Sequence, residues 1–401
     1  MSKKKDIFKW FEYVIAALMV YCNGSWLFME YKTPMILLLI TSLLCYMGMR
    51  IKYKRRLSNP NFIIVFMALF PLLSLLVNFG KDINYFSVVY TAILYLLLGF
   101  LNLDTIASIL DKYSGIIYKL AIVTLILGPL FLALPMLLNR IPIRYTNFVS
   151  DEYGYYNFII YTFRVSGGTR AQSIFWEPGA WAINQAFALY WIVFKNKDYK
   201  KMPVLFLSLL FTVSTTGFAL GLILLAVSFI TVKSNGFRFK LLALFFSVVL
   251  ILSSLAVYIN ATTNIDVGQL LYDQVVGKFL DSTDTNVSYQ DRKNSTAEAF
   301  NIALTHPFFG AGKKVESSAI FVTSSLAEIA YQLGLIYLFC YFLLYRLIFN
   351  KLGILMSTIF VFIMMNGEAY AFMILSSMIL IFGSKIVVKK SFWNKNIISN
   401  T

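Results

Sequence analysis

Long apolar runs recur from one end of the chain to the other, and they constrain its fold more than any other feature. Each run is about 20 residues long, the length that a helix needs to cross the roughly 30 Å hydrocarbon core of a bilayer. Of the 401 residues, 59% are hydrophobic and only 13% are charged. A water-soluble globule needs a largely polar surface, which this composition cannot supply. The sequence therefore predicts an all-α polytopic membrane protein.

Hydropathy and span length predict about twelve transmembrane helices within a single integral membrane domain over residues 1–401. The N-terminus is basic and then apolar, like a signal peptide, but no cleavage site of small residues follows it. The first run is therefore expected to be a retained span. The expected spans are 10–29, 34–49, 61–78, 84–103, 115–138, 178–194, 203–216, 217–232, 239–258, 321–345, 350–366 and 369–387.

The formal net charge of +16 raises the possibility of a nucleic-acid partner. However, Lys and Arg occur in short clusters between the apolar runs and form no basic face that could follow a phosphate backbone. The positive-inside rule explains this distribution better, because the clusters concentrate in alternate short segments. We expect no nucleic-acid partner, and we expect both termini on the cytoplasmic side.

Two segments between spans, 139–177 and 259–320, are much longer than the others and are expected on the outer side. The first is rich in Tyr and Phe, which could be membrane-border anchors or platforms for sugars. The second has apolar residues at helical spacing from Ile265 to Phe279, a pattern typical of an amphipathic helix on the membrane surface. Two capping boxes, at Ser288 and Ser295, then open a helix expected to run to about Leu304. Arg292 would lie on or just before its first turn.

The stretch "RAQSIFWEPGAW", residues 170–181, places charged residues where a long outer segment meets an apolar run. Pro178 suits the first turn of the span, because its missing N–H would be unpaired there anyway. Glu177 then falls near the N-cap, where the helix dipole favours a carboxylate. Two interpretations are open: Glu177 caps the helix while Arg170 is a solvated charge, or both serve a site.

The stretch "THPFFGAGKK", residues 305–314, contains the only histidine, His306. It is not a phosphate-binding P-loop, because Pro307 and Lys314 stand where that motif needs Gly and Ser or Thr. A glycine turn returning the chain to the membrane is the plainer interpretation. Among the expected spans, only Glu12 and Glu328 place an ionisable group well inside. Carriers usually bury such groups near the midplane, so the pattern favours an interfacial enzyme.

Together these motifs resemble the O-antigen polymerase and O-antigen ligase superfamily of bacterial envelope glycan assembly. "RAQSIFWEPGAW" is similar to the Arg-x-x-Gly-x-Phe-x-(Glu/Asn)-Pro signature of that superfamily, with Ser173 where Gly is common. "STTGFALGLILL" resembles its Ser/Thr-rich turn before a further span. "DRKNSTAEAFNIALTHPFFGAG" is similar to its Arg-containing helix followed by Pro-x-x-Gly-x-Gly. The order and spacing of the three motifs carry the resemblance.

The resemblance implies a GT-C-like fold and a glycosyltransferase at the outer face of the bacterial plasma (inner) membrane. Its substrate would be an oligosaccharide repeat unit on undecaprenyl diphosphate, so the leaving group is a lipid diphosphate. Neither long segment holds an Asp-x-Asp or His/Cys cluster, so no metal and no other cofactor is expected. The implied catalytic residues are Arg170, Glu177, Arg292 and His306, and the implied substrate-binding residues are Arg164, Asp291, Gly310, Gly312 and Lys313.

In this scheme Arg170 and Arg292 hold the diphosphate, because arginine is always charged and can grip phosphate oxygens through two N–H groups. Glu177 either orients Arg170 or takes the acceptor proton, and His306 is the weaker base candidate.

Ligases of the superfamily usually carry a His-Asn/Ser motif before the span that follows the second long segment, where this chain has Thr323, Ser324 and Ser325. This difference favours a polymerase. A ligase that transfers polymer to an acceptor such as lipid A-core, and a flippase or exporter of lipid-linked oligosaccharide, are the alternatives. The product could belong to lipopolysaccharide O-antigen, a capsule or another exopolysaccharide. A flippase and a chain-length regulator are the expected protein partners.

Overall fold

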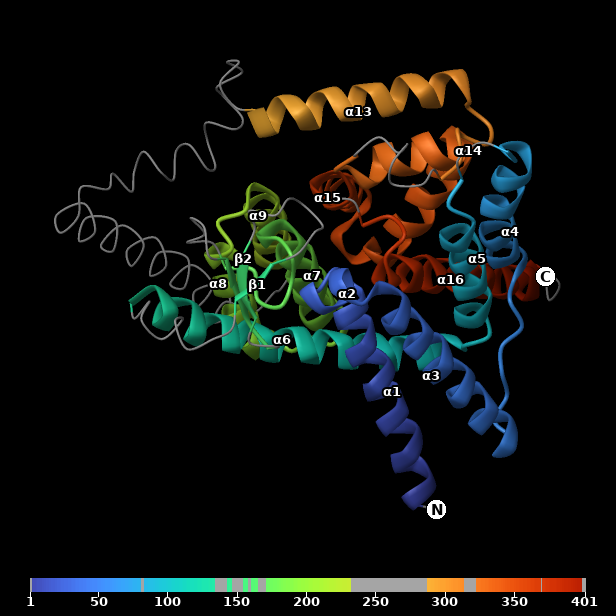
Figure 1. Cartoon of the computed structure of the whole chain (residues 1–401). Coiled ribbons are helices and arrows are strands. Elements are labelled where there is room, and N and C mark those ends of the chain that lie inside the picture. The colour runs from blue at the N-terminus through green and yellow to red at the C-terminus, as the bar shows by residue number, and fades with distance from the viewer. Residues whose placement is uncertain are drawn as a thin grey trace. The chain divides into compact units, whose positions relative to one another are not determined.

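The computed structural model describes residues 2–80, 83–133, 143–145, 154–157, 160–164, 171–231, 287–313, 322–368 and 370–398 (Figure 1). The chain divides into two compact units. The first comprises Met1–Ile116 together with Asp291–Thr401, and the second comprises Ile117–Gln290. Each unit is described by itself below.

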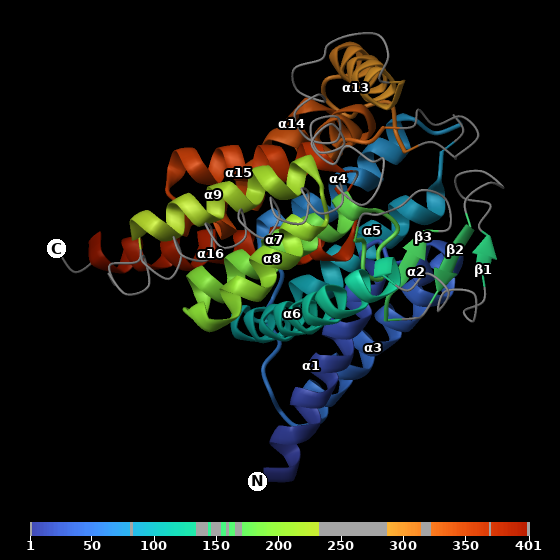
Figure 2. The ribbon, with the colours of Figure 1, turned by 90° about the vertical axis from the view of Figure 1, so that its left-hand side faces the viewer.

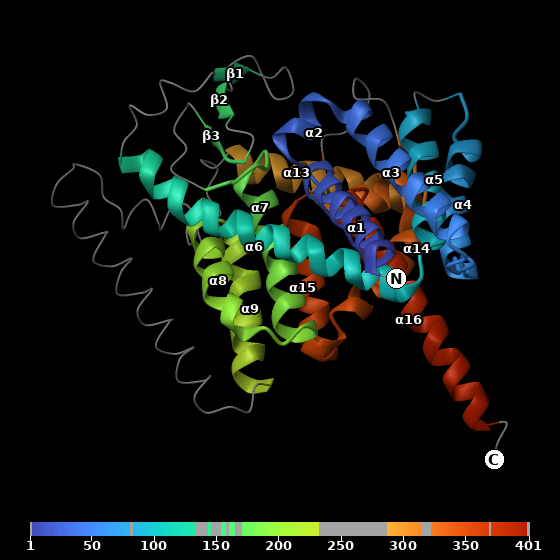
Figure 3. The same cartoon turned by 90° about the horizontal axis from the view of Figure 1, so that it is seen from below.

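The first unit is helical in its described residues. The two ends of the chain meet in it: α4 packs against α5, while α14 packs against α4, α15 and α16. Helix α1 packs against α3, and α16 continues beyond its neighbours toward the C-terminus (Figure 3). The helices are α1 (Ser2–Cys22), α2 (Trp26–Glu30), α3 (Lys32–Lys52), α4 (Phe62–Val77), α5 (Tyr85–Gly99), the first part of α6 (Leu103–Ala133), α13 (Val287–Thr305, from Asp291 on), α14 (Ser325–Ile348), α15 (Ile354–Gly367) and α16 (Ile374–Ile398).

Short polar side chains begin several of these apolar helices. The side chains of Ser25, Asn61, Asn84 and Ser324 each accept a hydrogen bond from a backbone N–H in the first turn that follows. Such a cap satisfies one of the four N–H groups that a helix start leaves without an intrahelical partner. The caps therefore fix where the apolar runs begin.

Where the structure describes it, the second unit combines the later part of α6 with a small sheet and the helices α7, α8 and α9. Strands β1 (Ile143–Tyr145), β2 (Gly154–Asn157) and β3 (Thr162–Arg164) form an antiparallel sheet in the order β1-β2-β3. Helix α7 (Pro178–Tyr190) continues into a π-helical turn at Trp191–Lys195 and packs against α8 (Met202–Phe211) and α9 (Thr215–Thr231), which Figure 2 shows together. A 3₁₀ turn at Tyr199–Lys201 leads into α8.

The expected mostly helical fold is confirmed, and the helices lie close to the expected spans. The seventh and eighth spans were expected to meet between residues 216 and 217, and the chain breaks a few residues earlier, since α8 ends at Phe211 and α9 begins at Thr215. Among the described residues, three helical stretches are long and apolar enough to cross a membrane: Lys32–Lys52, Leu103–Leu130 and Ser325–Ile348. The full set of about twelve spans and the orientation of the termini stay predictions. The expected span 239–258 and the amphipathic helix near Ile265 lie outside the described residues.

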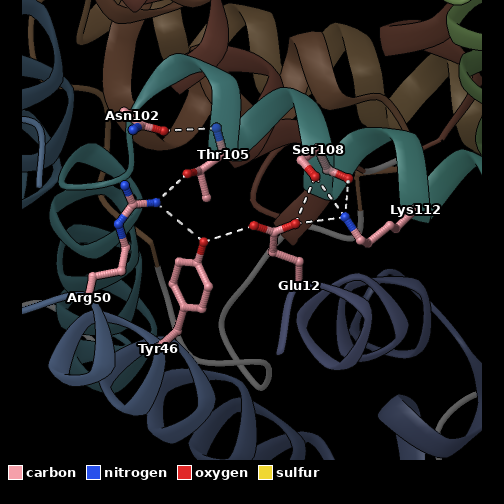
Figure 4. A network of polar contacts seen from close by, with 7 residues as sticks. All are labelled: Glu12, Tyr46, Arg50, Asn102, Thr105, Ser108 and Lys112. Atoms are coloured by element: carbon pink, nitrogen blue, oxygen red, sulfur yellow. Dashed lines mark hydrogen bonds and ion pairs between the residues drawn. The ribbon is translucent and has the colours of Figure 1, made fainter. Parts of the chain in front are cut away.

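Glu12, one of the two charges expected inside spans, belongs to a polar network that joins α1, α3 and α6 (Figure 4). Its Oε1 accepts a hydrogen bond from the Tyr46 hydroxyl (2.9 Å). Its Oε2 accepts from Ser108 Oγ and Lys112 Nζ, each at 2.7 Å. Arg50 extends the network by donating to the Tyr46 hydroxyl oxygen (3.3 Å). A buried carboxylate with this many partners is a structural feature that ties three helices together.

Candidate active site

The segment that follows α13 is held against an interruption in α14. Gly334 has φ 85° and ψ 172°, so the helix is broken at this residue. Three backbone hydrogen bonds cross between the segment and the interruption. They run from Leu335 N–H to the Pro307 carbonyl (2.8 Å), from Ala311 N–H to the Tyr331 carbonyl (2.8 Å), and from Gly312 N–H to the Gln332 carbonyl (3.2 Å). The segment therefore takes up backbone groups that the broken helix leaves without partners.

Glycines make this close approach possible. A Cβ on Gly310 would lie 2.4 Å from the Gln332 carbonyl carbon, and one on Gly334 would lie 2.7 Å from the carbonyl oxygens of Pro307 and Phe308. Both glycines also have positive φ, which side-chain-bearing residues rarely adopt. The Pro-x-x-Gly-x-Gly pattern therefore has a packing role here. The substrate-binding role expected for Gly310 and Gly312 stays a prediction.

Side chains of α4 and the start of α5 hold the same segment from the other side. Ser74 Oγ donates to the Phe309 carbonyl (2.6 Å), and Asn78 Nδ2 donates to the Gly310 carbonyl (3.2 Å). The backbone N–H of Asn84 donates to the Lys313 carbonyl (2.7 Å). The position of Lys313 is therefore determined by elements that are more than 200 residues apart in the sequence.

Lys313 lies next to the second charge expected inside a span, Glu328. The Lys313 ammonium is 4.3 Å from the centre of the Phe372 ring, a cation–π contact. Burial lowers the pKa of Lys313 to about 8; the charge of Glu328 opposes this shift, and that of Lys32 adds to it. Glu328 occupies the first turn of α14, and its Oε1 accepts from Gln332 Nε2 (3.3 Å). The arrangement brings a cation, a carboxylate and an amide together.

The start of α14 is fixed by the residues that stand where ligases of the superfamily carry their histidine motif. Ser324 Oγ donates to Asn366 Oδ1 (2.8 Å) and accepts from the Ala327 N–H (3.4 Å). Ser325 Oγ donates to the Glu368 carbonyl (2.6 Å) and accepts from the Tyr370 N–H (2.6 Å). Both serines are buried. They join the start of α14 to the last turn of α15 and to the chain that follows it.

Helix α13 begins earlier than the capping boxes predict. It starts at Val287 and runs unbroken to Thr305, so the box at Ser295 lies inside the helix. Arg292 is therefore the sixth residue of the helix, beyond the four N–H groups that a helix start leaves free. The expectation that Arg292 lies on or just before the first turn is wrong, and a contribution of free helix N–H groups to phosphate binding at this residue falls with it. Asp291 precedes it within the same helix.

His306 follows the other end of α13, about 20 Å along the helix axis from Arg292 at 1.5 Å per residue. The imidazole is exposed, and its Nδ1 lies 2.9 Å from Thr305 Oγ1 and 3.3 Å from the Ile302 carbonyl oxygen. It is thus held against the end of its own helix. The structure separates Arg292 from His306 and instead groups His306, Gly310, Gly312 and Lys313 on one short segment.

Between these ends, α13 packs on α14 through small residues. Ala299 of α13 is buried in a cluster with Ala311, Val322, Ala327 and Tyr331. Figure 1 shows α13 next to α14. Arg292 stands about 10 Å along the helix from Ala299.

In the second unit, the structure describes the signature stretch from Ala171 on, so Arg170 lies outside the described residues. Pro178 is the first residue of α7 and Glu177 is its N-cap, as predicted, but the Glu177 side chain makes no capping hydrogen bond. The N-cap position expected for Glu177 is therefore confirmed, and its role in a site stays a prediction. Arg164 ends β3, where only its backbone is described.

Ser173 explains why glycine is common at its position in the superfamily. Its φ is 53°, in the left-handed region that favours glycine, and its side chain is buried. Its carbonyl accepts from the Thr162 N–H (2.7 Å), which joins the signature stretch to β3. Two residues later, Phe175 stacks on Trp181 at a centroid distance of 5.3 Å and fixes the turn against α7.

The mostly helical fold and its long apolar helices define the class as an integral membrane protein. Residues 203–332 match the family model of O-antigen ligase. This match supports the O-antigen ligase and polymerase superfamily, whose members are membrane enzymes of the glycosyltransferase or ligase type, and it confirms the resemblance predicted from the motifs. No curated protein and no solved structure matches the chain.

The matched residues include α8, α9, Lys313 and the first turns of α14 as far as Gln332. The signature stretch at 170–181 precedes them. Within the described part of the chain, no group of three or more His, Cys, Asp or Glu side chains is placed to hold a metal ion. The metal independence expected from the sequence stays a prediction.

Proposed function

We propose that this protein is a membrane glycosyltransferase that polymerises undecaprenyl-diphosphate-linked oligosaccharide repeat units. The observation that carries the proposal is the family match over residues 203–332, which ends within α14. The stretch where the resemblance places a ligase histidine holds Thr323, Ser324 and Ser325 instead. Ser324 and Ser325 anchor α14, so their hydroxyls are already engaged in structural bonds. Because this stretch has no histidine and its serines are engaged in structural bonds, a polymerase is favoured over a ligase.

In this proposal Arg170 and Arg292 hold the departing lipid diphosphate and Lys313 adds a third positive charge. The leaving group carries away negative charge, so fixed cations stabilise it as the bond to the sugar breaks. Arginine side chains thereby replace a metal ion, and no cofactor takes part. Arg164 and Asp291 contact the substrate nearby. Glu177 orients Arg170 or accepts the acceptor proton.

The reaction would take place at the outer face of the bacterial plasma membrane, with both termini in the cytoplasm. A flippase would supply the lipid-linked units and a chain-length regulator would limit the product. The glycan would belong to O-antigen, capsule or another exopolysaccharide.

Deleting the gene tests the reaction type. Each candidate function leaves a different product: loss of a polymerase leaves single repeat units on the surface, and loss of a ligase leaves polymer on the lipid carrier. Loss of a flippase leaves units in the cytoplasm. We expect single surface units, seen as a collapsed ladder on a glycan gel, with restoration by the wild-type gene. A full ladder, stranded polymer or trapped cytoplasmic units would each contradict a polymerase.

The proposed role of Lys313 predicts a pH dependence. Because burial lowers the pKa of Lys313 to about 8, the side chain is charged below that pH and becomes neutral as the pH rises through it. Loss of one charged contact to the diphosphate should lower kcat/KM for the lipid-linked donor about tenfold between pH 7 and pH 9. Lys313→Arg keeps its charge over this range, so its kcat/KM should stay flatter. The same decline in both proteins would exclude Lys313 as its cause.

A further inference from the structure

Glu328 is the buried charge whose chemistry the proposed function has not yet used. It lies in the first turn of α14, directly after the capping residue Ser324. The bonds of Ser324 and Ser325 to Asn366 and Glu368 hold this turn in place. Glu328 as a whole is half-buried, but the oxygens of its carboxyl group lie within the packing. The anchored first turn therefore holds the carboxyl group in a fixed position.

The two oxygens of this carboxyl group have different surroundings. Oε1 accepts the hydrogen bond from Gln332 Nε2 at 3.3 Å. Oε2 is screened from solvent and has no hydrogen-bond partner among the described residues. The Gln332 Oε1 atom beside it is screened and unpartnered in the same way. An ionised carboxylate can accept about four hydrogen bonds, and leaving a buried oxygen without one is costly. Such an atom in a native structure calls for an explanation, and a catalytic role is one of those that occur.

Neighbouring positive charges offset part of the cost of burying a carboxylate in this place. Lys313 on the adjoining segment and Lys32 at the start of α3 both attract Glu328 electrostatically. Tyr341 on α14 itself interacts with its charge, and the packed elements also carry Glu298 on α13 and Glu368 after α15. Lys313, the cation that the proposed function places on the leaving diphosphate, is thus the neighbour of a carboxylate with an unused oxygen. The carboxylate that accepts the proton and the ammonium that binds the departing diphosphate would then be neighbours in one site.

We propose that Glu328 is the general base that accepts the proton of the acceptor sugar hydroxyl, a role that rests on the proposed function. The acceptor oxygen forms the new glycosidic bond to the anomeric carbon of the donor sugar. The bond from that carbon to the diphosphate oxygen breaks, and undecaprenyl diphosphate leaves with the electron pair. The hydroxyl proton passes to Oε2 of Glu328. Gln332 holds the other oxygen, and Glu177 is then left to orient Arg170.

The test uses the purified full-length protein and a lipid-linked repeat unit, with chain elongation measured against pH. Glu328→Gln preserves the shape but removes the basic oxygen, so the rate should fall about a hundredfold or more. The wild-type rate should decline toward low pH as the carboxylate becomes protonated, and this decline is the acidic limb of the pH profile. The residual rate of Glu328→Gln should lack the acidic limb. Glu328→Asp should keep the limb at an intermediate rate. Glu298→Gln, which alters an exposed glutamate of α13, should match the wild type.

A double variant separates this role from simple neutralisation of Lys313. If Glu328 only balanced that charge, combining Lys313→Met with Glu328→Gln would raise the rate from that of Glu328→Gln to that of Lys313→Met alone. Such recovery would overturn the inference, as would a Glu328→Gln rate near that of the wild type or one that keeps the acidic limb. If Glu328→Gln does not accumulate in the membrane, two other measurements test the inference: whether Glu328→Asp keeps the acidic limb, and how fast the double variant elongates glycan. Wild-type protein that elongates nothing would overturn the proposed function and the inference together.

Discussion

Replacing Arg170 or Arg292 with lysine should reduce polymerisation about a hundredfold, although the positive charge remains. A lysine ammonium is a point charge and cannot offer the two parallel N–H groups with which arginine grips a phosphate. Losing such a contact in a water-poor site costs about 3 kcal/mol of transition-state stabilisation, which corresponds to this change in rate. The measurements are the rate of elongation in vitro and the length of the glycan ladder in cells, at matched protein levels.

Arg144 provides the matched control for these substitutions. It lies in β1, early in the first long segment, and we expect it to be solvated. Arg144→Lys should therefore elongate glycan at nearly the wild-type rate. Near-normal polymer from both Arg170→Ala and Arg292→Ala would exclude a two-arginine clamp. A loss in Arg144→Lys equal to that in the other two variants would point to a general effect of altering the long segments.

Replacing Gly334 with alanine should destabilise the protein by about 3 kcal/mol or more. Part of the loss is the cost of about 1–2 kcal/mol for a side-chain-bearing residue in the left-handed region. The rest comes from the new Cβ, which would lie 2.7 Å from the carbonyl oxygens of Pro307 and Phe308. These are backbone atoms held by hydrogen bonds, so they cannot move aside as a flexible side chain could. The measurements are the thermal midpoint in detergent and the amount of protein in the membrane.

Gly353 separates the two contributions to this loss. Its φ of 82° is nearly the same as the 85° of Gly334, but a Cβ at Gly353 would meet nothing within 4 Å. Gly353→Ala should therefore cost only the conformational part. Equal losses in the two variants would show that the close approach of residues 307–312 to α14 contributes nothing to stability.

The sequence predicted most of the helices because hydropathy and span length are strong signals over about 20 residues. The break between α8 and α9 was predicted from the polar residues around Ser214, and the position of Pro178 from its missing N–H. The three short strands were not predicted, since runs of three or four residues in an aromatic segment show no clear alternation. The start of α13 was misplaced because a capping box is a local signal that a longer helix can continue through.

The candidate site was harder to predict, because it depends on contacts between distant parts of the chain. The sequence marked Lys313 and Glu328 separately but could not show that they are neighbours. The interruption at Gly334 was also invisible, since the apolar run continues through it. Only the pairing with Pro307 and Gly312 reveals why α14 bends away from helical geometry there. The electrostatic pairing of Glu328 with Lys313 therefore comes from the structure alone.

The seating of residues 307–312 on the broken part of α14 sets a rule for building chimeras between members of this superfamily. Exchanging the second long segment is an obvious way to try to change which sugars are joined. A crossover placed between residues 313 and 322 would separate Gly310 from Gln332, and Pro307 from Gly334, although each is shaped to fit the other. Residues 307–335 should therefore be transplanted as one piece, with the junction placed before His306.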